Sequence, residues 1–345
     1  MYKVEEGKYN IVHPLLESNN ELSVFSVTQG SMPGKIFVND PNHPTAALIQ
    51  TSECNLLCGD VHDAEFNASL SSELDFWDPV TPDAQKWDAV IPQIHKNRFI
   101  RKYTRRRYIL NAESKISFTY NLPEGYYVEP VIPENLRCNH YENADKLLAW
   151  IDAWGSDEAF CTYGAGCYVR KEKVIVSWSI SDCFFRDRIA IGVHTDARYR
   201  RKGFGIISVE ETIKLCFSKG YKAIEWLCVD SNKGSVKVAE KLGFALAGKY
   251  DAFTSYPPIE NPADLSEKEW NDWGAYLEKA SESEPRLLTE CLFAYIKANN
   301  VNKANTLLAI HRERKPVEHN IKGFIHYLHT IGMATHFHEN WPDTV

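Results

Sequence analysis

The sequence predicts an α/β (α+β) protein, and three observations support this fold class. Residues 188–195 form an alternating apolar segment, which is typical of a strand. The segment from Ile206 to Phe217 then places apolar side chains at helical spacing. A second apolar run at 223–229 is followed by a short helical pattern that ends at Gly243, where glycine suits the position after a helix. Strands and helices therefore alternate through this part of the chain.

Length and composition are those of a globular protein with two or more domains. The chain has 345 residues, of which 44% are hydrophobic and 25% are charged. Its formal net charge of −7 argues against binding nucleic acid through overall electrostatics. The nine cysteines are scattered, no apolar run approaches a membrane span, and Met1–Glu6 lacks the apolar core of a signal peptide. We therefore expect a cytoplasmic protein with reduced thiols and no nucleic-acid or membrane partner.

Residues 1–122 are predicted to form an N-terminal unit. It contains strand patterns at 35–38 and 44–50 and a helical stretch after Ala64. Its closing strand carries a dense basic run: Lys96, Arg98, Arg101, Lys102, Arg105, Arg106 and Arg107. This run is either a patch for a phosphate or acidic partner or the solvated face of a strand. The aromatic residues interspersed with the cations favour the strand.

Residues 123–260 are predicted to form a second unit, which begins after a linker at 122–125. At 174–181, apolar side chains alternate with serines, and this period of two predicts a half-buried strand. The predicted strands of this unit before the glycine-bearing loop span 126–130, 166–169, 174–181 and 189–195, and a helix spans 144–153.

Residues 261–345 are predicted to form a C-terminal helical extension. Its first part carries Trp270 and Trp273, and the segments 286–299 and 301–313 are predicted to pair as antiparallel helices. This pair resembles one tetratricopeptide-type hairpin. Because a single hairpin buries too little surface to be stable alone, we expect it to pack on the second unit or on a partner.

The loop Arg200–Gly205, between a predicted strand and a predicted helix, is typical of a site for a phosphorylated ligand. The first amides of a helix have no intrahelical acceptor, and the helix dipole favours negative charge there. Gly203 and Gly205 let the backbone approach phosphate oxygens because no Cβ intervenes. The sequence has no Walker lysine motif after Gly205, which argues against a nucleotide kinase or GTPase.

The order of motifs around this loop resembles the GNAT superfamily of acyl-CoA N-acyltransferases. A strand, Arg-x-x-Gly-x-Gly, a helix, a second strand, Asn232-x-x-Ser235, a short helix and Gly243-Phe244 agree in spacing as well as in residue type. The resemblance implies the GNAT fold, a mixed and mostly antiparallel sheet flanked by helices. It also implies that two central strands separate to admit acetyl-CoA as co-substrate.

The order of the units further resembles the bacterial acetyltransferase family that contains the zwittermicin A resistance protein. The segments Pro33–Val38, Leu122–Tyr126 and Ser177-Trp178 carry this likeness, which covers roughly residues 10–275. In that family the first unit resembles a degenerate acetyltransferase half without a phosphate loop, and no Gly-x-Gly precedes residue 122 here. The C-terminal helices lie outside the resemblance.

The GNAT resemblance also implies where acetyl-CoA binds. The cofactor-binding residues would be Val193, Thr195, Arg200, Arg201, Lys202, Gly203, Phe204, Gly205 and Asn232. The amides of 201–205 would bind the diphosphate, the amides of Val193 and Thr195 would lie near the thioester carbonyl, and Asn232 would contact the cofactor arm. As an alternative that is compatible with this role, Asn232 caps the following helix.

Neither of the two acid–base residues common in the family is present. The usual carboxylate position falls on Ile189 and the usual tyrosine position on Ala239. His194 is the candidate catalytic residue because an imidazole accepts a proton near neutral pH, although a structural role for this histidine fits equally well. The weaker candidates are Asp182, Asp196, Cys228 and Asp230. Catalysis by positioning alone is a further alternative.

No metal site is predicted. Cys54 and Cys58 lack a second pair nearby, which argues against zinc. The one His-dense region fits a helix surface better than a metal site, and it comprises His326, His329, His336 and His338. The aromatic residues considered for an acceptor cleft are Trp226, Tyr250 and Tyr256, although core packing suits Trp226 better.

The sequence thus predicts an acetyl-CoA-dependent N-acetyltransferase that acts on a primary amine of a small molecule, such as an antibiotic or an amino-polyol. One alternative makes the acceptor a peptide or protein that docks on the terminal helices. A second alternative is a non-catalytic acyl-CoA-binding sensor or scaffold, which the missing acid–base residues favour. The oligomeric state is open, and a homo-oligomer is compatible with the sequence.

Overall fold

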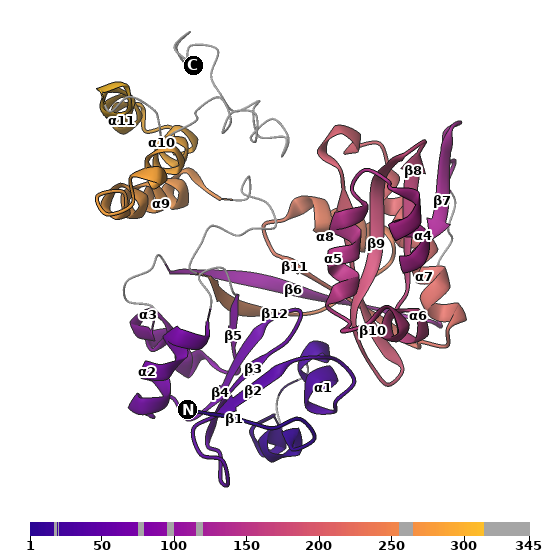
Figure 1. Cartoon of the computed structure of the whole chain (residues 1–345), viewed down its shortest axis with the longest axis horizontal. Coiled ribbons are helices and arrows are strands. Elements are labelled where there is room, and N and C mark those ends of the chain that lie inside the picture. The colour runs from indigo at the N-terminus through magenta and orange to yellow at the C-terminus, as the bar shows by residue number, and fades with distance from the viewer. Residues whose placement is uncertain are drawn as a thin grey trace. The chain divides into compact units, whose positions relative to one another are not determined.

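The computed structural model describes residues 1–16, 19, 21–74, 79–94, 100–114, 120–254 and 265–313. The chain divides into two compact units, Met1–Ser255 and Tyr256–Val345 (Figure 1). None of the helices in the described ranges is both long enough and apolar enough to span a membrane.

The described strands of the first unit form one twelve-stranded sheet, in the order β1-β2-β3-β4-β5-β12-β6-β11-β10-β9-β8-β7. The pairs β4–β5 and β10–β11 are parallel, and the other neighbours are antiparallel. The fold is therefore mixed α/β with a mostly antiparallel sheet, as predicted. The strands are β1 (Tyr2–Lys3), β2 (Lys35–Val38), β3 (Ala46–Gln50), β4 (Asn55–Gly59), β5 (Val80–Pro82), β6 (Arg101–Asn111), β7 (Tyr126–Pro130), β8 (Gly166–Lys171), β9 (Val174–Phe185), β10 (Arg188–Thr195), β11 (Ala223–Val229) and β12 (Ala245–Thr254).

Helices flank this sheet. Those of the first unit are α1 (Leu22–Thr28), α2 (Ala64–Glu73), α3 (Ile91–Ile94), α4 (Pro133–Asn139), α5 (Ala144–Asp152), α6 (Asp157–Tyr163), α7 (Phe204–Ser218) and α8 (Lys233–Lys241), with short 3-10 helices at Tyr9–Leu16, Gln85–Ala89 and Ala197–Tyr199. One core packs α7 and α8 against Tyr108, Ile191 and Trp226. A second core packs α4, α5 and α6 against the opposite face, at Trp178 and Ala190.

The basic strand β6 lies inside this sheet. It pairs with β11 on one side and with β12 on the other, so the sheet continues across the boundary predicted at residue 122 (Figure 1). Four cations of this strand form ion pairs: Lys102 with Asp88, Arg105 with Glu53, Arg106 with Asp230 and Arg107 with Glu225. Arg105 and Arg107 are buried. The strand prediction is confirmed. Lys102 is exposed, as expected of a solvated face, but the expectation is wrong for Arg105 and Arg107, which are buried against carboxylates from other elements.

Strand β9 is buried on both faces, so its predicted half-exposure is also wrong. Ser177, Ser179 and Ser181 have no exposed surface. Helix α7 covers them with hydroxyl groups of its own. Thr212 Oγ1 donates to the Ser179 carbonyl at 3.1 Å, and Ser208 Oγ lies 3.3 Å from Ser177 Oγ. Polar residues on this face therefore mark a hydrogen-bonded contact between strand and helix.

The second unit contains α9 (Glu267–Ala280), a 3-10 helix (Pro285–Leu287), α10 (Leu288–Lys297) and α11 (Val301–Glu313). The predicted helices at 286–299 and 301–313 are confirmed in α10 and α11. Helix α9 starts with a capping box made by Ser266 and Glu269 and packs on α10 through Trp270 and Phe293, whose ring centroids are 5.5 Å apart. The described part of the unit therefore has three α-helices, one short 3-10 helix and buried side chains of its own. The four histidines of the His-dense region lie outside the described residues.

Candidate active site

The neighbouring strands β10 and β11 are paired along only part of their length, and we call the region where they separate the fork. Their parallel ladder pairs Arg188–Ala190 with Ala223–Glu225, and within the described strands it ends there, although β10 continues to Thr195 and β11 to Val229. On the other side of β10, the amide of Asp196 donates to the carbonyl of Val176 on β9. Because hydrogen bonding alternates along an antiparallel strand, the N–H and C=O groups of Val193 and Thr195 point away from β9, into the fork.

The loop before α7 presents a row of unpaired amides. Arg201 and Gly203 have left-handed backbones, with φ of 61° and 86°. The first amides of α7 with an acceptor in the described structure are those of Ile206 and Ile207, which donate to the Gly203 carbonyl at 3.1 and 3.2 Å. Among the described residues the amides of 201–205 have no hydrogen-bond acceptor, and no side chain caps α7. The positive end of a 15-residue helix is thus open to an anion.

Gly205 brings the start of α7 against the end of β10. A Cβ at this position would lie 3.1 Å from Thr195 Oγ1 and 3.7 Å from Val193 Cγ2. The hydroxyl groups of Thr195 and Ser177 lie 2.8 Å apart, which holds this end of β10 to β9. The absence of a side chain at Gly205 therefore places the amide-rich loop directly beside the mouth of the fork.

Basic and aromatic side chains surround the loop. Arg200 and Lys202 are exposed, and Arg200 Nε donates to the Thr195 carbonyl at 3.2 Å. Lys202 Nζ lies 5.3 Å from the centre of the Tyr199 ring. Phe204 is buried and stacks on Tyr126 at 4.5 Å, which anchors the first turn of α7. The cations suit a phosphate-bearing ligand, and the aromatic contacts fix the backbone that would bind it.

Asn232 follows β11 and caps α8. Its Oδ1 accepts a hydrogen bond from the amide of Ser235 at 3.0 Å, and the Ser235 hydroxyl accepts one from Trp226 Nε1 at 2.9 Å. No partner of Asn232 Nδ2 is recorded among the described residues, so this group can still donate. Trp226 is a core residue, as the sequence favoured.

The positions at which the family usually carries its base and its acid are both in the core. Ile189 and Ala239 have no exposed surface and pack in the cluster beneath α7 and α8. Neither side chain is polar, so neither can accept or donate a proton. Any proton transfer in this protein therefore uses other residues or water.

His194 lies on the face of β10 opposite α7. Its ring stacks on Trp178 with centroids 4.4 Å apart. Burial, assisted by the charges of Arg200 and Lys146, lowers the pKa of His194 to about 4. The ring is therefore neutral at pH 7 and can accept a hydrogen bond, but its conjugate acid would hold a proton only weakly.

The weaker candidates separate into three kinds. Asp196 accepts hydrogen bonds from Arg198 and Asn143, and these contacts hold its pKa well below the usual range. Asp230 pairs with Arg106 and Lys249, which lowers its pKa to about 2, and Cys228 is a core thiol. Asp182 differs because burial raises its pKa to about 6 and its Oδ1 has no hydrogen-bond partner.

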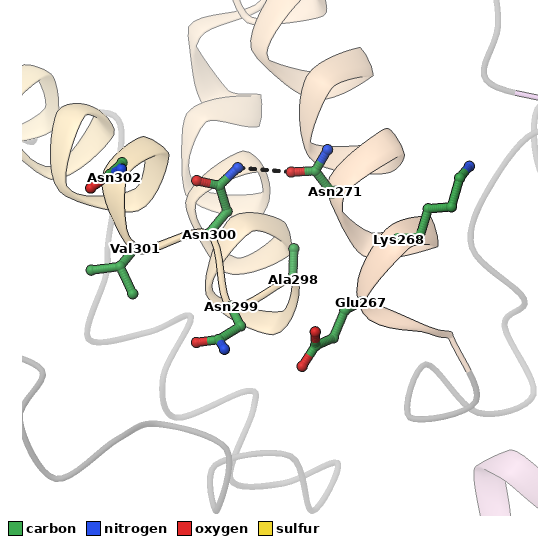
Figure 2. A pocket seen from close by; sticks show the side chains of 8 residues that line it. All are labelled: Glu267, Lys268, Asn271, Ala298, Asn299, Asn300, Val301 and Asn302. Atoms are coloured by element: carbon green, nitrogen blue, oxygen red, sulfur yellow. Dashed lines mark hydrogen bonds between the residues drawn. The ribbon is translucent and has the colours of Figure 1, made fainter.

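Two cavities elsewhere contain none of the predicted site residues. One of about 550 Å³ lies beside the N-terminal 3-10 helix, where Tyr9, His13 and Gln29 line it. The other, of about 500 Å³, lies in the second unit between the start of α9 and the α10–α11 turn. Figure 2 shows its polar lining, in which Asn300 Nδ2 donates to Asn271 Oδ1 at 2.8 Å. In the described ranges, no group of three or more His, Cys, Asp or Glu residues could hold a metal ion.

Sequence reasoning did not foresee which residues approach the fork from the α5 side. Trp150 of α5 lies over Gly192, where a Cβ would come within 2.6 Å of the indole ring. Gly192 was visible in the strand pattern, but no local signal indicated that an aromatic ring from another element would cover it. The fork and the amide-rich loop thus form an open site between two separating parallel strands, with the geometry that suits a phosphate-bearing group.

Comparison with known proteins identifies the family. A model of the GNAT acetyltransferase family matches residues 13–253. An uncharacterized N-acetyltransferase of Bacillus subtilis, YdfB, is 22% identical over 242 residues, which are 67% of this chain and 89% of that protein. The crystal structure of a GCN5-related N-acetyltransferase-like protein from Streptococcus suis has a TM-score of 0.59 and 22% identity, and the match covers 72% of this chain and 98% of that one. The chain belongs to the GNAT acetyltransferase family and is an acyltransferase.

Proposed function

We propose that this protein transfers the acetyl group of acetyl-CoA to a primary amine of a small molecule, in the cytoplasm. The observation that carries the donor half of this proposal is the run of five unpaired amides at 201–205, beside a fork whose edge amides are those of Val193 and Thr195. Charged acceptors form hydrogen bonds worth roughly 1.5–3 kcal/mol each, so a few such bonds account for micromolar affinity after ordering costs.

The residues around the fork have distinct roles in this proposal. The amides of 201–205 bind the diphosphate, with Arg200, Arg201 and Lys202 adding positive charge at the mouth. The amides of Val193 and Thr195 donate to the thioester carbonyl, where negative charge develops as the amine attacks. Asn232 Nδ2 donates to the cofactor arm while Oδ1 caps α8.

The groups proposed to accept the proton of the attacking amine, His194 and water, are weak bases. During the reaction the amine nitrogen bonds to the acetyl carbon, the carbon–sulfur bond breaks, and the amine loses a proton. We propose that neutral His194 accepts that proton and passes it to water, which also protonates the thiolate. Because the pKa of His194 is near 4, most of the rate enhancement would come from positioning and from the fork amides.

The acceptor is the least constrained part of the proposal. An antibiotic or amino-polyol acceptor rests on the resemblance to the zwittermicin A resistance family, which is an analogy. A protein acceptor that docks on α9–α11 is an alternative, since these helices form a compact unit of their own. A non-catalytic acyl-CoA sensor is a second alternative, because the usual acid–base positions are occupied by Ile189 and Ala239.

The test measures coenzyme A retention by equilibrium dialysis and thiol release from acetyl-CoA against panels of small amines and peptides. We expect retention near the micromolar range and turnover with small amines, with no inflection from His194 in the profile of kcat/KM between pH 6 and pH 8. Failure to retain coenzyme A would refute the proposal. Retention without turnover on any amine or peptide would instead support the sensor, and turnover confined to peptides would support the protein acceptor.

A further inference from the structure

Three hydroxyl groups meet beside the mouth of the fork. They belong to Ser177 of β9, Thr195 at the end of β10 and Ser208 in α7, and we call them the hydroxyl bridge. Ser177 Oγ lies 2.8 Å from Thr195 Oγ1 and 3.3 Å from Ser208 Oγ. Ser177 and Ser208 are fully buried, and Thr195 is half-buried. The bridge therefore connects three elements of the fold at the site.

The hydrogen bonds of the bridge run in one direction. A hydroxyl group has one hydrogen to donate and two lone pairs that accept. The Ser177 hydroxyl donates to the His194 carbonyl at 3.0 Å, so Thr195 Oγ1 is the donor in its contact with Ser177 Oγ. The Ser208 hydroxyl donates to the Gly205 carbonyl at 3.1 Å and can share its hydrogen with Ser177 Oγ. Ser177 thus uses its whole hydrogen-bonding capacity in the bridge.

Thr195 contacts the amide-bearing loop at both of its ends. Arg200, which opens the loop, donates from Nε to the Thr195 carbonyl at 3.2 Å. Gly205, in the first turn of α7, lies so close that an added Cβ would be 3.1 Å from Thr195 Oγ1. The side chain of Thr195 is in turn fixed by Ser177 of β9. The position of the loop relative to the end of β10 therefore depends on this residue.

Hydrogen bonds at this contact fix a distance that apolar packing would leave adjustable. Hydrogen bonds are directional and have a narrow range of length, whereas apolar contacts are non-directional. The loop needs such constraints because Arg201 has a left-handed backbone, which persists only where surrounding contacts determine it. Strand β10 needs them as well, because its ladder with β11 ends at Ala190 within the described strands. The bridge supplies them from β9, the neighbour with which β10 stays paired.

We propose that the hydroxyl bridge positions the donor for the transfer reaction by holding the loop amides and the strand amides at a fixed separation. This inference rests on the proposed function, in which residues 201–205 bind the diphosphate and the amides of Val193 and Thr195 donate to the thioester carbonyl. The arm that joins the diphosphate to the thioester has a limited length. A shift of the loop along β10 would therefore move the carbonyl away from its donors without removing the amides that bind the diphosphate. Ser177 and Thr195 are thus positioning residues through their hydroxyl groups.

The test compares turnover with coenzyme A affinity in Thr195→Val, which keeps the branched shape of the side chain and removes its hydroxyl group. With the best acceptor of the amine panel, kcat at saturating acetyl-CoA should fall about tenfold or more, because the thioester carbonyl is misplaced. The dissociation constant of coenzyme A, measured by calorimetry, should change about threefold or less, because the loop amides remain. A variant that merely destabilised the loop would instead weaken both.

Two further variants test the hydroxyl groups themselves. Thr195→Ser keeps the donor and should restore most of kcat. Ser177→Ala removes the acceptor and should reproduce the kcat loss of Thr195→Val. When both Thr195→Val and Ser177→Ala are present, the loss should be no larger than the larger of the two single losses, because both act through one contact.

Thr212→Val is the matched control. Thr212 Oγ1 also joins α7 to β9, because it donates to the Ser179 carbonyl at 3.1 Å, and it accepts from the Cys167 amide at 3.0 Å. It lies about two turns along α7 from Gly205, away from the loop. Its removal should lower the melting temperature at least as much as Thr195→Val does, while kcat stays at the value of the parent.

The outcomes distinguish this inference from the function on which it rests. A parent that does not retain coenzyme A, or that acetylates no amine, contradicts the proposed function itself. With an active parent, the inference alone is overturned by an unchanged kcat in Thr195→Val, by a coenzyme A affinity that falls as much as kcat, by a serine variant as slow as the valine variant, or by an equal kcat loss in Thr212→Val. A kcat loss that Ser177→Ala shares, that serine at 195 reverses and that coenzyme A affinity does not follow supports it.

Discussion

Two parallel crossovers in the same sheet invite comparison, β4–α2–β5 and β10–α7–β11. Each begins with a strand, continues through a helix and returns to a parallel ladder of three residue pairs. In the first, the pairs join Asn55–Leu57 to Val80–Pro82. Both crossovers therefore have the same local topology. Only in the second does the loop between the first strand and the helix contain a glycine.

In the first crossover, aspartate carboxylates accept hydrogen bonds from the backbone amides at the strand edge and at the start of the helix. Beyond the β4–β5 ladder, Asp83 bridges the strands, because its Oδ2 accepts from the Gly59 amide at 2.9 Å and its amide donates to the Leu57 carbonyl at 2.8 Å. Asp63 caps α2 by accepting from the Phe66 amide at 2.8 Å. At the second crossover the strands separate and the amides before α7 have no such acceptor.

The difference shows that topology alone does not make an anion site. A parallel crossover can form an anion site only where no side chain accepts hydrogen bonds from the first helix amides and from the strand edges. This contrast supports our proposal that the N-terminal part, which we place at 1–122, is a degenerate half of the enzyme. We likewise propose 123–260 as the catalytic part and 261–345 as the helical extension.

The largest expected effect is on coenzyme A affinity, when the loop before α7 in the second crossover is distorted by substitution. Gly203→Val should weaken coenzyme A binding by about 100-fold or more, measured by calorimetry. A β-branched residue at φ 86° costs about 1–3 kcal/mol or forces the loop to move, and a moved loop loses amide–phosphate bonds.

Gly220→Val is the matched control for this loss. Gly220 has φ 94°, has no neighbouring atoms within 4 Å of an added Cβ, and lies just past the other end of α7. It should carry a similar strain without changing coenzyme A affinity. If both variants lose affinity equally, the effect is one of helix stability and the comparison between crossovers fails.

A smaller effect is expected from Asp182, a carboxyl group whose ionisation is disfavoured by burial. Burial raises the pKa of Asp182 to about 6, above its value in the unfolded chain, so the folded state loses stability as the pH rises from about 4 to about 6. Asp182→Asn should therefore increase the free energy of unfolding by roughly 1–3 kcal/mol at pH 8, and the gain should vanish near pH 4, where the unfolded chain is also protonated. Denaturant unfolding at pH 4, 6 and 8 measures this. A variant that is less stable than the parent at pH 8 would contradict it.

The smallest expected effect is on the free energy of unfolding, when the helix cap in the β4–α2–β5 crossover is removed. Asp63→Ala removes the cap of α2 and should cost about 1 kcal/mol of stability at pH 7. Hydrogen bonding to the Phe66 amide lowers the pKa of Asp63, so this cost should shrink as the pH falls through the lowered pKa, which is the opposite trend to Asp182. Urea unfolding of the variant measures the cost, and coenzyme A affinity should not change. A parallel loss of affinity would show that α2 is coupled to the site.

Most elements near the glycine loop follow from local pattern. The strands at 35–38, 126–130 and 223–229 have the bounds predicted for them, and α7 starts at Phe204 directly after the glycine of its N-cap. Strand β12 and helix α1 were not predicted. Strand β12 lies inside the sheet, between β5 and β6. A bulge near Ala247 interrupts its alternation of inward and outward side chains, so its sequence pattern alone is a weak strand signal.

The sequence by itself determined the geometry of the glycine-bearing loop, because a left-handed backbone and a row of free amides follow from glycine, chain direction and the start of a helix, all within six residues. It also determined the fold class, since apolar period is a local property. Only the tertiary structure decided that β9 is buried on its serine face and that carboxylates from other elements pair with the cations of β6. Those outcomes depend on contacts between residues from 14 to 124 positions apart. A linear pattern carries no information about which distant charge will neutralise a given one.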